Sequence, residues 1–261
     1  MQLLVSVRSA DEVEQALAGG ADIIDAKEPD RGPLGAVDRN VLNRILQRVP
    51  DDCGVSVALG DVTRPEEVLA AVHGLELPER ASPMYLKLGF AGVQSPNQIR
   101  LLLETAASVT SGMTASPRIV AVAYADSERA RTVPPTLIPP LAEAADAAGV
   151  LLDTYGKDGR GLLEWIPSGA LVDWVAVARQ AGLLTALAGS LRPRDLALVG
   201  RAQPEVVGVR GAVCSGGRQG RVSEHRVRQF RLALEWAVRE TRDIGAISSG
   251  TTAAKSRKLK A

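Results

Sequence analysis

The sequence predicts an α/β fold: a single (β/α)8 TIM barrel with a disordered C-terminal tail. Three observations lead to this fold class. The chain has 261 residues, of which 46% are hydrophobic, and this size suits one barrel. Short apolar runs alternate with longer segments of helical periodicity, and the alternation occurs eight times. We expect the barrel in residues 1–242, and the tail, rich in Ser, Thr, Ala and Lys, in residues 243–261.

The apolar runs are predicted to be parallel strands, because the segments between them are long enough for crossover helices. They are Leu3–Val7, Asp22–Ala26, Gly54–Leu59, Met84–Leu88, Arg118–Tyr124, Val150–Asp153, Leu183–Leu187 and Glu205–Val209. A strand–helix unit repeated in this way closes into a barrel more readily than it forms an open sheet.

Helix boundaries are marked by residue type. Helices are predicted to end at Gly19, Gly149 and Gly182, since glycine tolerates the left-handed conformation of a helix cap, and a buried strand follows. Pro65 and the Ser95-Pro pair are typical of helix starts.

A doubly wound sheet is the alternative architecture. The segment Val7–Asp11 argues against it, because this segment lacks the glycines of a dinucleotide-binding turn. The proline-rich stretch Val133–Pro140 is predicted to be a rigid loop that leads into a helix, not a linker between domains.

Composition excludes several classes of function. The formal net charge is only +1 and aromatic residues make up 3%, which argues against nucleic-acid and membrane-surface binding. No apolar run reaches the roughly 20 residues of a membrane span, and the N-terminus has the pattern of a strand, not of a signal peptide. We therefore expect a cytoplasmic protein, and a homo-oligomer because barrels commonly self-associate.

Cysteine and histidine are scarce. Cys53 and Cys214 form no spaced pair and are expected to be small buried thiols. His73 and His225 are isolated, so a His/Cys transition-metal site is not expected, although residue counts leave a magnesium site with oxygen ligands open.

Barrel active sites lie at the C-terminal ends of the strands. At the end of the second strand Asp25 and Lys27 share one face, because side chains alternate along a strand, and Ile24 and Ala26 take the helix-facing side. Two opposite charges on an inward face are costly without a function or a partner. The alternative is a structural ion pair.

The fourth strand ends with a second inward-facing lysine, Lys87, which shares its face with Tyr85. A single lysine at a strand end is usually a solvated rim residue. Two neighbouring ammonium groups, however, lower each other's pKa, and partial burial lowers it further. A neutral amine is what an imine-forming nucleophile or a general base requires.

The sixth strand ends with Asp153, and Lys157 lies in the following loop between Gly156 and Gly159. A carboxylate near a lysine amine can move protons during imine formation. The alternative is an ordinary polar loop. Asp61 and Asp126, after the third and fifth strands, could also reach the pocket, but neither signal exceeds that of any barrel rim.

The last two strands end in small residues whose N–H groups can approach an anion, at the usual phosphate site of a barrel. We expect phosphate or substrate contacts from Gly189, Ser190, Arg210, Gly211 and Ala212. Arg210 could instead be a structural barrel charge. The glycine-rich segment Cys214–Arg221 could close over a ligand.

Taken in order, these motifs resemble the (5-formylfuran-3-yl)methyl phosphate synthase family, from the first strand to about residue 220. The resemblance rests on Ala18–Pro29, Gly32–Ala36, Gly60–Val62, Tyr85–Gly89, Ala123–Asp126, Leu152–Thr154, Lys157–Gly159, Leu187–Ser190 and Val207–Ala212. The chain departs from the family pattern at Tyr155 and Gly156, where small aliphatic residues are expected.

The resemblance implies an enzyme of methanofuran biosynthesis, in one-carbon metabolism, that makes a furan phosphate from two glyceraldehyde 3-phosphate molecules. It implies that Lys27 forms a Schiff base and that Lys87 is a proton acceptor, with Asp25, Asp153 and Lys157 in the pocket. We expect a triose phosphate in its ketone form to be captured by Lys27, and the resulting enamine to attack the aldehyde of a second triose. No metal or organic cofactor is expected, because the imine replaces a Lewis acid.

Two alternatives stay open at this point. One is a different Schiff-base aldolase or phosphosugar isomerase on the same barrel, since fold alone does not fix the reaction. The other is a non-catalytic barrel that binds phosphosugars. Two inward lysines favour the enzyme, because binding requires charge but not a lowered pKa.

Overall fold

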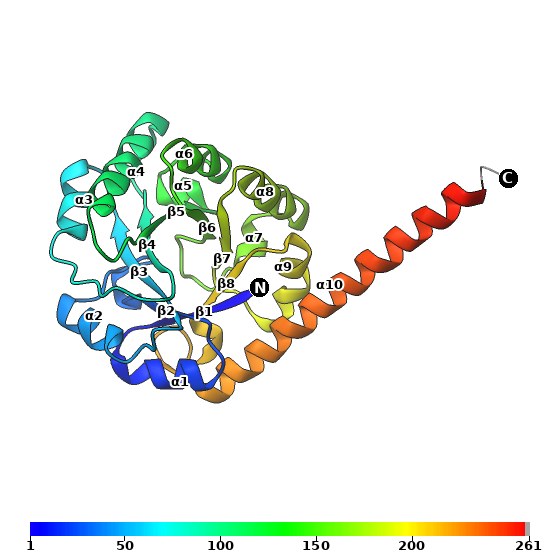
Figure 1. The fold of residues 1–261 in the computed structure, drawn as a ribbon, viewed down its shortest axis with the longest axis horizontal. Helices are drawn as coiled ribbons and strands as arrows, with labels where there is room; N and C mark the ends of the chain where they lie inside the picture. Colours follow the sequence, from blue (N-terminus) through cyan, green and yellow to red (C-terminus); the bar gives the residue numbers. More distant parts are fainter. Residues whose placement is uncertain (259–261) are drawn as a thin grey trace.

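The computed structural model describes the backbone of residues 1–258 and the side chains of residues 1–241. Helix α10 spans Glu224–Lys258 and lies beside α9 and α1 (Figure 1). The segment 243–261, expected to be a disordered tail, lies outside the residues whose side chains are described.

Eight parallel strands form a closed barrel in chain order, in which β8 pairs with β1 (Figure 1). The strands are β1 (Gln2–Val7), β2 (Ile23–Ala26), β3 (Gly54–Asp61), β4 (Met84–Gly89), β5 (Arg118–Tyr124), β6 (Gly149–Asp153), β7 (Leu184–Leu187) and β8 (Val206–Val209). The predicted (β/α)8 barrel is confirmed, and every predicted strand coincides with an observed one apart from one or two end residues. Closure leaves no exposed sheet edge.

Helices surround the barrel (Figure 1). They are α1 (Val13–Ala18), α2 (Arg39–Leu46), α3 (Pro65–Val72), α4 (Pro96–Ser111), α5 (Ser127–Ala130), α6 (Ile138–Ala144), α7 (Leu162–Trp165), α8 (Ser168–Gln180) and α9 (Leu196–Ala202). Short 3-10 helices are η1 (Ala10–Glu12), η2 (Pro29–Arg31), η3 (Pro135–Leu137), η4 (Pro193–Asp195) and η5 (Gly211–Val213). After β8, a small antiparallel hairpin forms from β9 (Cys214–Ser215) and β10 (Arg221–Val222).

The helix starts follow the predicted signals, but one helix end does not. Pro65 and Pro96 each occupy the first turn of a helix, and Ser95 Oγ accepts a hydrogen bond from the Gln98 N–H. Gly149, predicted to cap a helix, is instead the first residue of β6, because α6 ends earlier. A side chain at Gly149 would collide with the Leu184 carbonyl of the neighbouring strand, 2.6 Å from the position of a Cβ atom. Gly149 therefore allows β6 to pair closely with β7.

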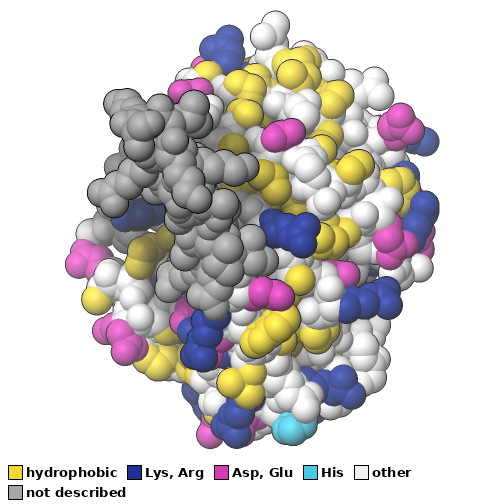
Figure 2. All heavy atoms as spheres, turned by 90° about the vertical axis from the view of Figure 1, so that its right-hand side faces the viewer, with side chains coloured by type: hydrophobic (Ala, Val, Ile, Leu, Met, Phe, Trp, Pro, Cys, Tyr) yellow, Lys and Arg dark blue, Asp and Glu magenta, His cyan; other side chains and the backbone are white. Residues whose placement is uncertain are grey.

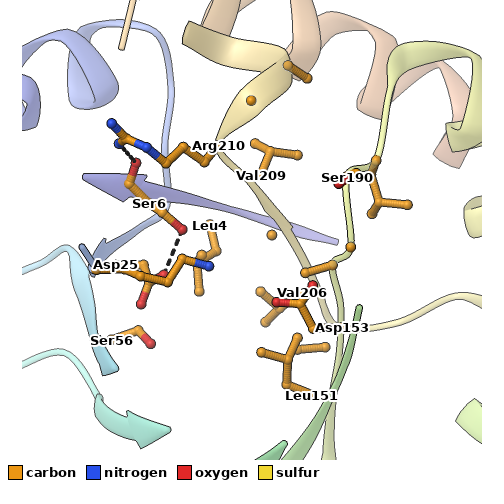
Figure 3. Close-up of a pocket in the computed structure, with 18 of the residues that line it drawn as sticks. Leu4, Ser6, Asp25, Ser56, Leu151, Asp153, Ser190, Val206, Val209 and Arg210 are labelled. Atoms are coloured by element: carbon orange, nitrogen blue, oxygen red, sulfur yellow. Dashed lines mark hydrogen bonds between the residues drawn. The ribbon is translucent and has the colours of Figure 1, made fainter. Parts of the chain in front are cut away.

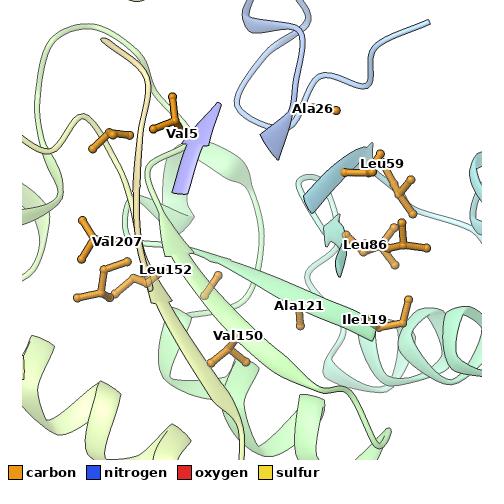
Figure 4. Close-up of a cluster of buried hydrophobic side chains, with 14 of the residues drawn as sticks. Val5, Ala26, Leu59, Leu86, Ile119, Ala121, Val150, Leu152 and Val207 are labelled. Atoms are coloured by element: carbon orange, nitrogen blue, oxygen red, sulfur yellow. The ribbon is translucent and has the colours of Figure 1, made fainter. Parts of the chain in front are cut away.

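The larger of two hydrophobic cores lies between the barrel and the helices. Alternate strand residues such as Val5, Ala26, Leu86 and Leu152 point outward and pack under the helices (Figure 4). This is the side predicted for Ala26. Burial of these apolar side chains is the main force that holds the helical layer on the barrel.

The smaller core lines the barrel interior, with inward residues that include Leu4, Ile23, Tyr85 and Val206. Toward the C-terminal ends of the strands the inward positions become small or polar. Ser6, Asp25, Ser56, Lys87, Ala188 and Gly208 stand there. The change from large apolar to small and polar side chains leaves a cavity at that end.

The outer surface is mixed in character. On the face drawn in Figure 2, hydrophobic side chains lie interspersed with Lys, Arg, Asp and Glu. Within the part of the chain that the structure describes, no helix combines the length and the apolar character needed to cross a membrane.

Candidate active site

A cavity of about 400 Å³ opens at the C-terminal end of the barrel. Its wall includes the residues predicted to be catalytic or to bind phosphate: Asp25, Lys27, Lys87, Asp153, Lys157, Gly189, Ser190, Arg210, Gly211 and Ala212. Asp61 and Asp126, which the sequence placed at the rim, do not line it. Figure 3 shows Asp25 on one side of this cavity and Asp153 and Ser190 on the other. The tertiary structure therefore brings the ends of five strands, β2, β4, β6, β7 and β8, to one space.

One side of the cavity holds a buried ion pair between β2 and β4, two strands that are separated by β3. Lys87 Nζ lies 2.6 Å from Asp25 Oδ1, and Ser6 Oγ donates to Asp25 Oδ2 at 2.7 Å (Figure 3). Burial acts to raise the pKa of Asp25, but the Lys87 and Lys27 ammonium groups outweigh it and lower that pKa. Asp25 is therefore an anion, and the carboxylate that we expected beside Lys27 is in direct contact with Lys87.

The opposite side holds a second ion pair. Lys157 Nζ donates to Asp153 Oδ1 at 2.9 Å and to the Thr154 carbonyl at 2.6 Å. The Thr154 N–H donates to the same carboxylate oxygen at 2.7 Å. Burial acts to raise the pKa of Asp153, but Lys157 and Lys27 lower it to about 2. Asp153 is thus also ionised at neutral pH.

Lys27 lies between these two pairs and has no partner of its own. Its backbone N–H continues the ladder to the Val7 carbonyl at 3.0 Å, which aims the side chain into the cavity. It is 6% exposed, and within the described residues no carboxylate lies within 4.0 Å of its ammonium nitrogen. Burial and the nearby Lys87 ammonium lower the pKa of Lys27 to about 7, against the opposing pull of Asp153 and Asp25. The site therefore holds one amine that can be neutral near pH 7.

The loop that carries Lys157 is tied to the end of β5. The two oxygens of Asp126 accept hydrogen bonds from the Tyr155 and Gly156 N–H groups at 2.6 and 2.8 Å. A Cβ at position 156 would lie 2.2 Å from the Arg129 guanidinium, so a larger residue there would require the Arg129 side chain to move. Asp126 positions the loop and does not line the cavity.

Asp61 also serves the framework beside the cavity. Its Oδ1 accepts a hydrogen bond from the buried Tyr124 hydroxyl at 2.8 Å and from the Ala91 N–H at 2.9 Å. Burial raises the pKa of the Asp61 carboxyl. The pair fixes the irregular end of β3 against β5, in the layer next to Asp153.

Arg210 points toward the cavity, but its hydrogen-bond donors are taken by the protein. Its Nη atoms donate to both carboxylate oxygens of the buried Glu12 at 2.9 and 3.3 Å. The remaining N–H groups donate to the carbonyls of Ser6, Arg218 and Gly220 at 2.9, 2.9 and 3.1 Å. All five guanidinium donors are therefore satisfied. The structure assigns Arg210 to holding the β9–β10 hairpin, the structural alternative noted from the sequence.

The hairpin in turn presents a cation that the sequence did not single out. Arg218 lines the cavity, donates to the Gly32 carbonyl at 2.9 Å, and has no carboxylate within 4.0 Å among the described residues. On the β7 and β8 ends, Gly189 and Ser190 have φ of +99° and +54°. Among the described residues, the Ser190 and Ala212 N–H groups donate to no protein acceptor. This part of the cavity has the donors that an anion requires.

Sequence reasoning also missed Ser6 and Ser56, two buried inward hydroxyls. Serine on an inward strand position next to charged residues was the available signal. This signal is weak, because a small polar residue is also common among the side chains that fill the interior of a barrel without any role in a site.

Sequence comparison gives a consistent result. The model of the 4-HFC-P synthase family matches residues 3–231. The (5-formylfuran-3-yl)methyl phosphate synthase of Methanopyrus kandleri is 35% identical over 236 residues, which cover 89% of this chain and 98% of the relative. That of Methanocaldococcus jannaschii is 34% identical over 234 residues, covering 88% and 98%.

Among solved structures, phosphoribosyl anthranilate isomerase from Thermus thermophilus superposes with a TM-score of 0.58 and 16% identity, covering 92% of this chain and 99% of that one. This likeness shows a shared barrel fold only. The match to the family over the whole barrel, with the predicted lysines and carboxylates around one cavity, shows that this chain belongs to the 4-HFC-P synthase family.

Proposed function

We propose that this protein is a (5-formylfuran-3-yl)methyl phosphate synthase, a lyase that condenses two glyceraldehyde 3-phosphate molecules through a Schiff base on Lys27. The observation that carries the proposal is the placement of Lys27, a buried, unpaired amine between two lysine–carboxylate pairs. A binding site for phosphosugars needs cations, whereas a nucleophile needs a lysine that can lose its proton near neutral pH.

Imine formation comes first in the proposed mechanism. The neutral Lys27 amine attacks the carbonyl carbon of a triose phosphate in its ketone form, and the carbonyl oxygen leaves as water. Lys157, 2.9 Å from Asp153, supplies the proton that the departing oxygen needs. The resulting imine carbon is electrophilic without any metal ion.

The product skeleton then fixes where the new carbon–carbon bond forms. In (5-formylfuran-3-yl)methyl phosphate the phosphorylated carbon branches from the ring, so the bond is made at the middle carbon of the triose that keeps its phosphate. That carbon is the imine carbon of the ketone form. Enamine attack on an aldehyde would instead join the trioses through a terminal carbon and give an unbranched chain.

The second triose is therefore the nucleophile. It loses a carbon-bound proton and its phosphate, and the terminal carbon of the resulting enol attacks the imine carbon. Lys87, next to the ionised Asp25, accepts protons in this half of the cavity. Loss of the Lys27 amine, ring closure by the terminal hydroxyl of the first triose and loss of water give the aromatic furan.

In this proposal the phosphate group binds on the β7–β8 side of the cavity, across from Asp25 and Lys87. Gly189, Ser190, Gly211 and Ala212 offer backbone donors, and Arg218 adds a positive charge. The phosphate is thereby held on the β7–β8 side while Lys27 reaches the middle carbon.

Borohydride reduction in the presence of glyceraldehyde 3-phosphate, followed by intact mass and peptide mapping, tests this function. We expect a reduced triose adduct on Lys27 and a furan chromophore during turnover. Lys27→Arg keeps the positive charge but forms no imine, so turnover should fall at least about 1,000-fold. A simple aldol adduct as the only product would identify another Schiff-base aldolase, and phosphate binding without adduct would identify a binding protein.

A further inference from the structure

Ser56 has a buried hydroxyl that the folded protein leaves without a partner. The residue lies on β3, is 1% exposed and lines the cavity. Within the described residues, its Oγ has no hydrogen-bond partner. Buried hydroxyls are nearly always bonded, and an unbonded one destabilises the fold, so a functional reason is expected.

An acceptor for a ligand hydroxyl lies on the neighbouring strand. Asp25 pairs with Ser56 in the β2–β3 register, and both side chains point into the barrel (Figure 3). Asp25 Oδ1 contacts the Lys87 ammonium at 2.6 Å, and a carboxylate oxygen can accept more than one hydrogen bond. A hydroxyl between the two side chains could accept from Ser56 and donate to Asp25.

The position of Ser56 and Asp25 relative to Lys27 indicates which hydroxyl of the substrate would lie between them. The phosphate donors lie on the β7–β8 side, Lys27 follows β2, and Ser56 lies one strand further, on β3. A triose held by its phosphate on the first side and by its middle carbon at Lys27 directs its remaining terminal carbon toward β3. That carbon carries a hydroxyl in the ketone form.

We propose that Ser56, together with Asp25, binds the terminal hydroxyl of the triose attached to Lys27 and determines specificity for a hydroxylated three-carbon phosphate. The inference rests on the proposed function and adds to it a subsite for the non-phosphorylated end. The same hydroxyl is the one that closes the furan ring, so Ser56 orients the group that Asp25 can deprotonate.

Two probes that differ only in this hydroxyl test the subsite: dihydroxyacetone phosphate and acetonyl phosphate, which lacks it. The measurement is the probe concentration that gives half-maximal borohydride-trapped adduct on Lys27, read by intact mass. For Ser56→Ala we expect this concentration to rise about tenfold for dihydroxyacetone phosphate and to stay unchanged for acetonyl phosphate.

Stability separates this role from a structural one. Ser56→Ala removes an unbonded hydroxyl, so its unfolding midpoint should equal or exceed that of the wild type. The control Thr110→Val removes a buried hydroxyl that donates to the Ala106 carbonyl in α4, and should lose stability but keep the preference between probes. If Ser56→Ala keeps the wild-type preference for dihydroxyacetone phosphate over acetonyl phosphate, the proposed subsite is wrong, while the proposed function stands. Absence of adduct with both probes in the wild type overturns the proposed function and the subsite with it.

Discussion

Lys27 shows how burial and neighbouring charge together set the reactivity of one residue. Its two flanking carboxylates are each in contact with another lysine, so neither neutralises it directly. Burial and the Lys87 ammonium therefore prevail, and the pKa of Lys27 falls from 10.5 to about 7. The same two carboxylates hold Lys87 and Lys157 in place on either side of it.

This pKa predicts the pH dependence of imine formation. Only the neutral amine is nucleophilic, so the rate of adduct formation should rise about tenfold per pH unit below pH 7 and level off above about pH 8. Stopped-flow mixing with dihydroxyacetone phosphate and borohydride across pH 5.5–9 measures this profile. A rate that still rises about tenfold per pH unit at pH 9 would instead mean that Lys27 behaves as a solvated lysine.

At the scale of elements, the β9–β10 hairpin depends on one buried ion pair. Glu12, from the η1 helix after β1, binds Arg210 at the end of β8, and its Oε1 also accepts from the Val222 N–H at 3.3 Å. Arg210 holds the carbonyls of Arg218 and Gly220. The Glu12–Arg210 pair thus connects β1 and β8, the two strands that close the barrel, to the hairpin that carries Arg218.

Loss of this pair should affect both stability and phosphate binding. Glu12→Ala leaves the Arg210 charge buried and unpaired, so we expect a loss of about 3–5 kcal/mol in the free energy of unfolding. Urea unfolding measures it, with Glu14→Ala on the exposed face of α1 as the matched control. Limited proteolysis should cut the hairpin in Glu12→Ala first. Equal stability of the two variants would show that the ion pair contributes nothing net.

At the scale of the whole molecule, the two hydrophobic cores have different roles. The outer core of strand and helix residues holds the helices on the barrel, whereas residues of the inner core line the cavity together with the charged side chains. Self-association of the barrel, expected from the sequence, stays a prediction that sedimentation equilibrium can test.

Thiol reactivity should report unfolding of the entire barrel. Cys53, directly before β3, and Cys214, in β9, are free and buried, and burial raises the pKa of both thiols. We expect both to react with a chromogenic disulfide reagent only as fast as the protein unfolds, and with the same rate constant. A fast phase for one thiol in native buffer would reveal local opening of its region instead.

The sequence by itself determined the barrel and the chemical character of the site. Alternating apolar runs and helix signals are local properties, so they predicted the strands to within a residue or two. The inward positions of Asp25, Lys27 and Lys87 followed from the two-residue period of a strand.

Only the tertiary structure decided which charges are in contact. Pairing of Asp25 with Lys87, of Asp153 with Lys157 and of Arg210 with Glu12 depends on distances between segments far apart in the chain. Among the residues whose side chains are described, these contacts leave Lys27 without a carboxylate within 4.0 Å, and Arg218 likewise has none. Strand period fixes the face of a side chain but not its partner, because the partner depends on barrel register and loop path.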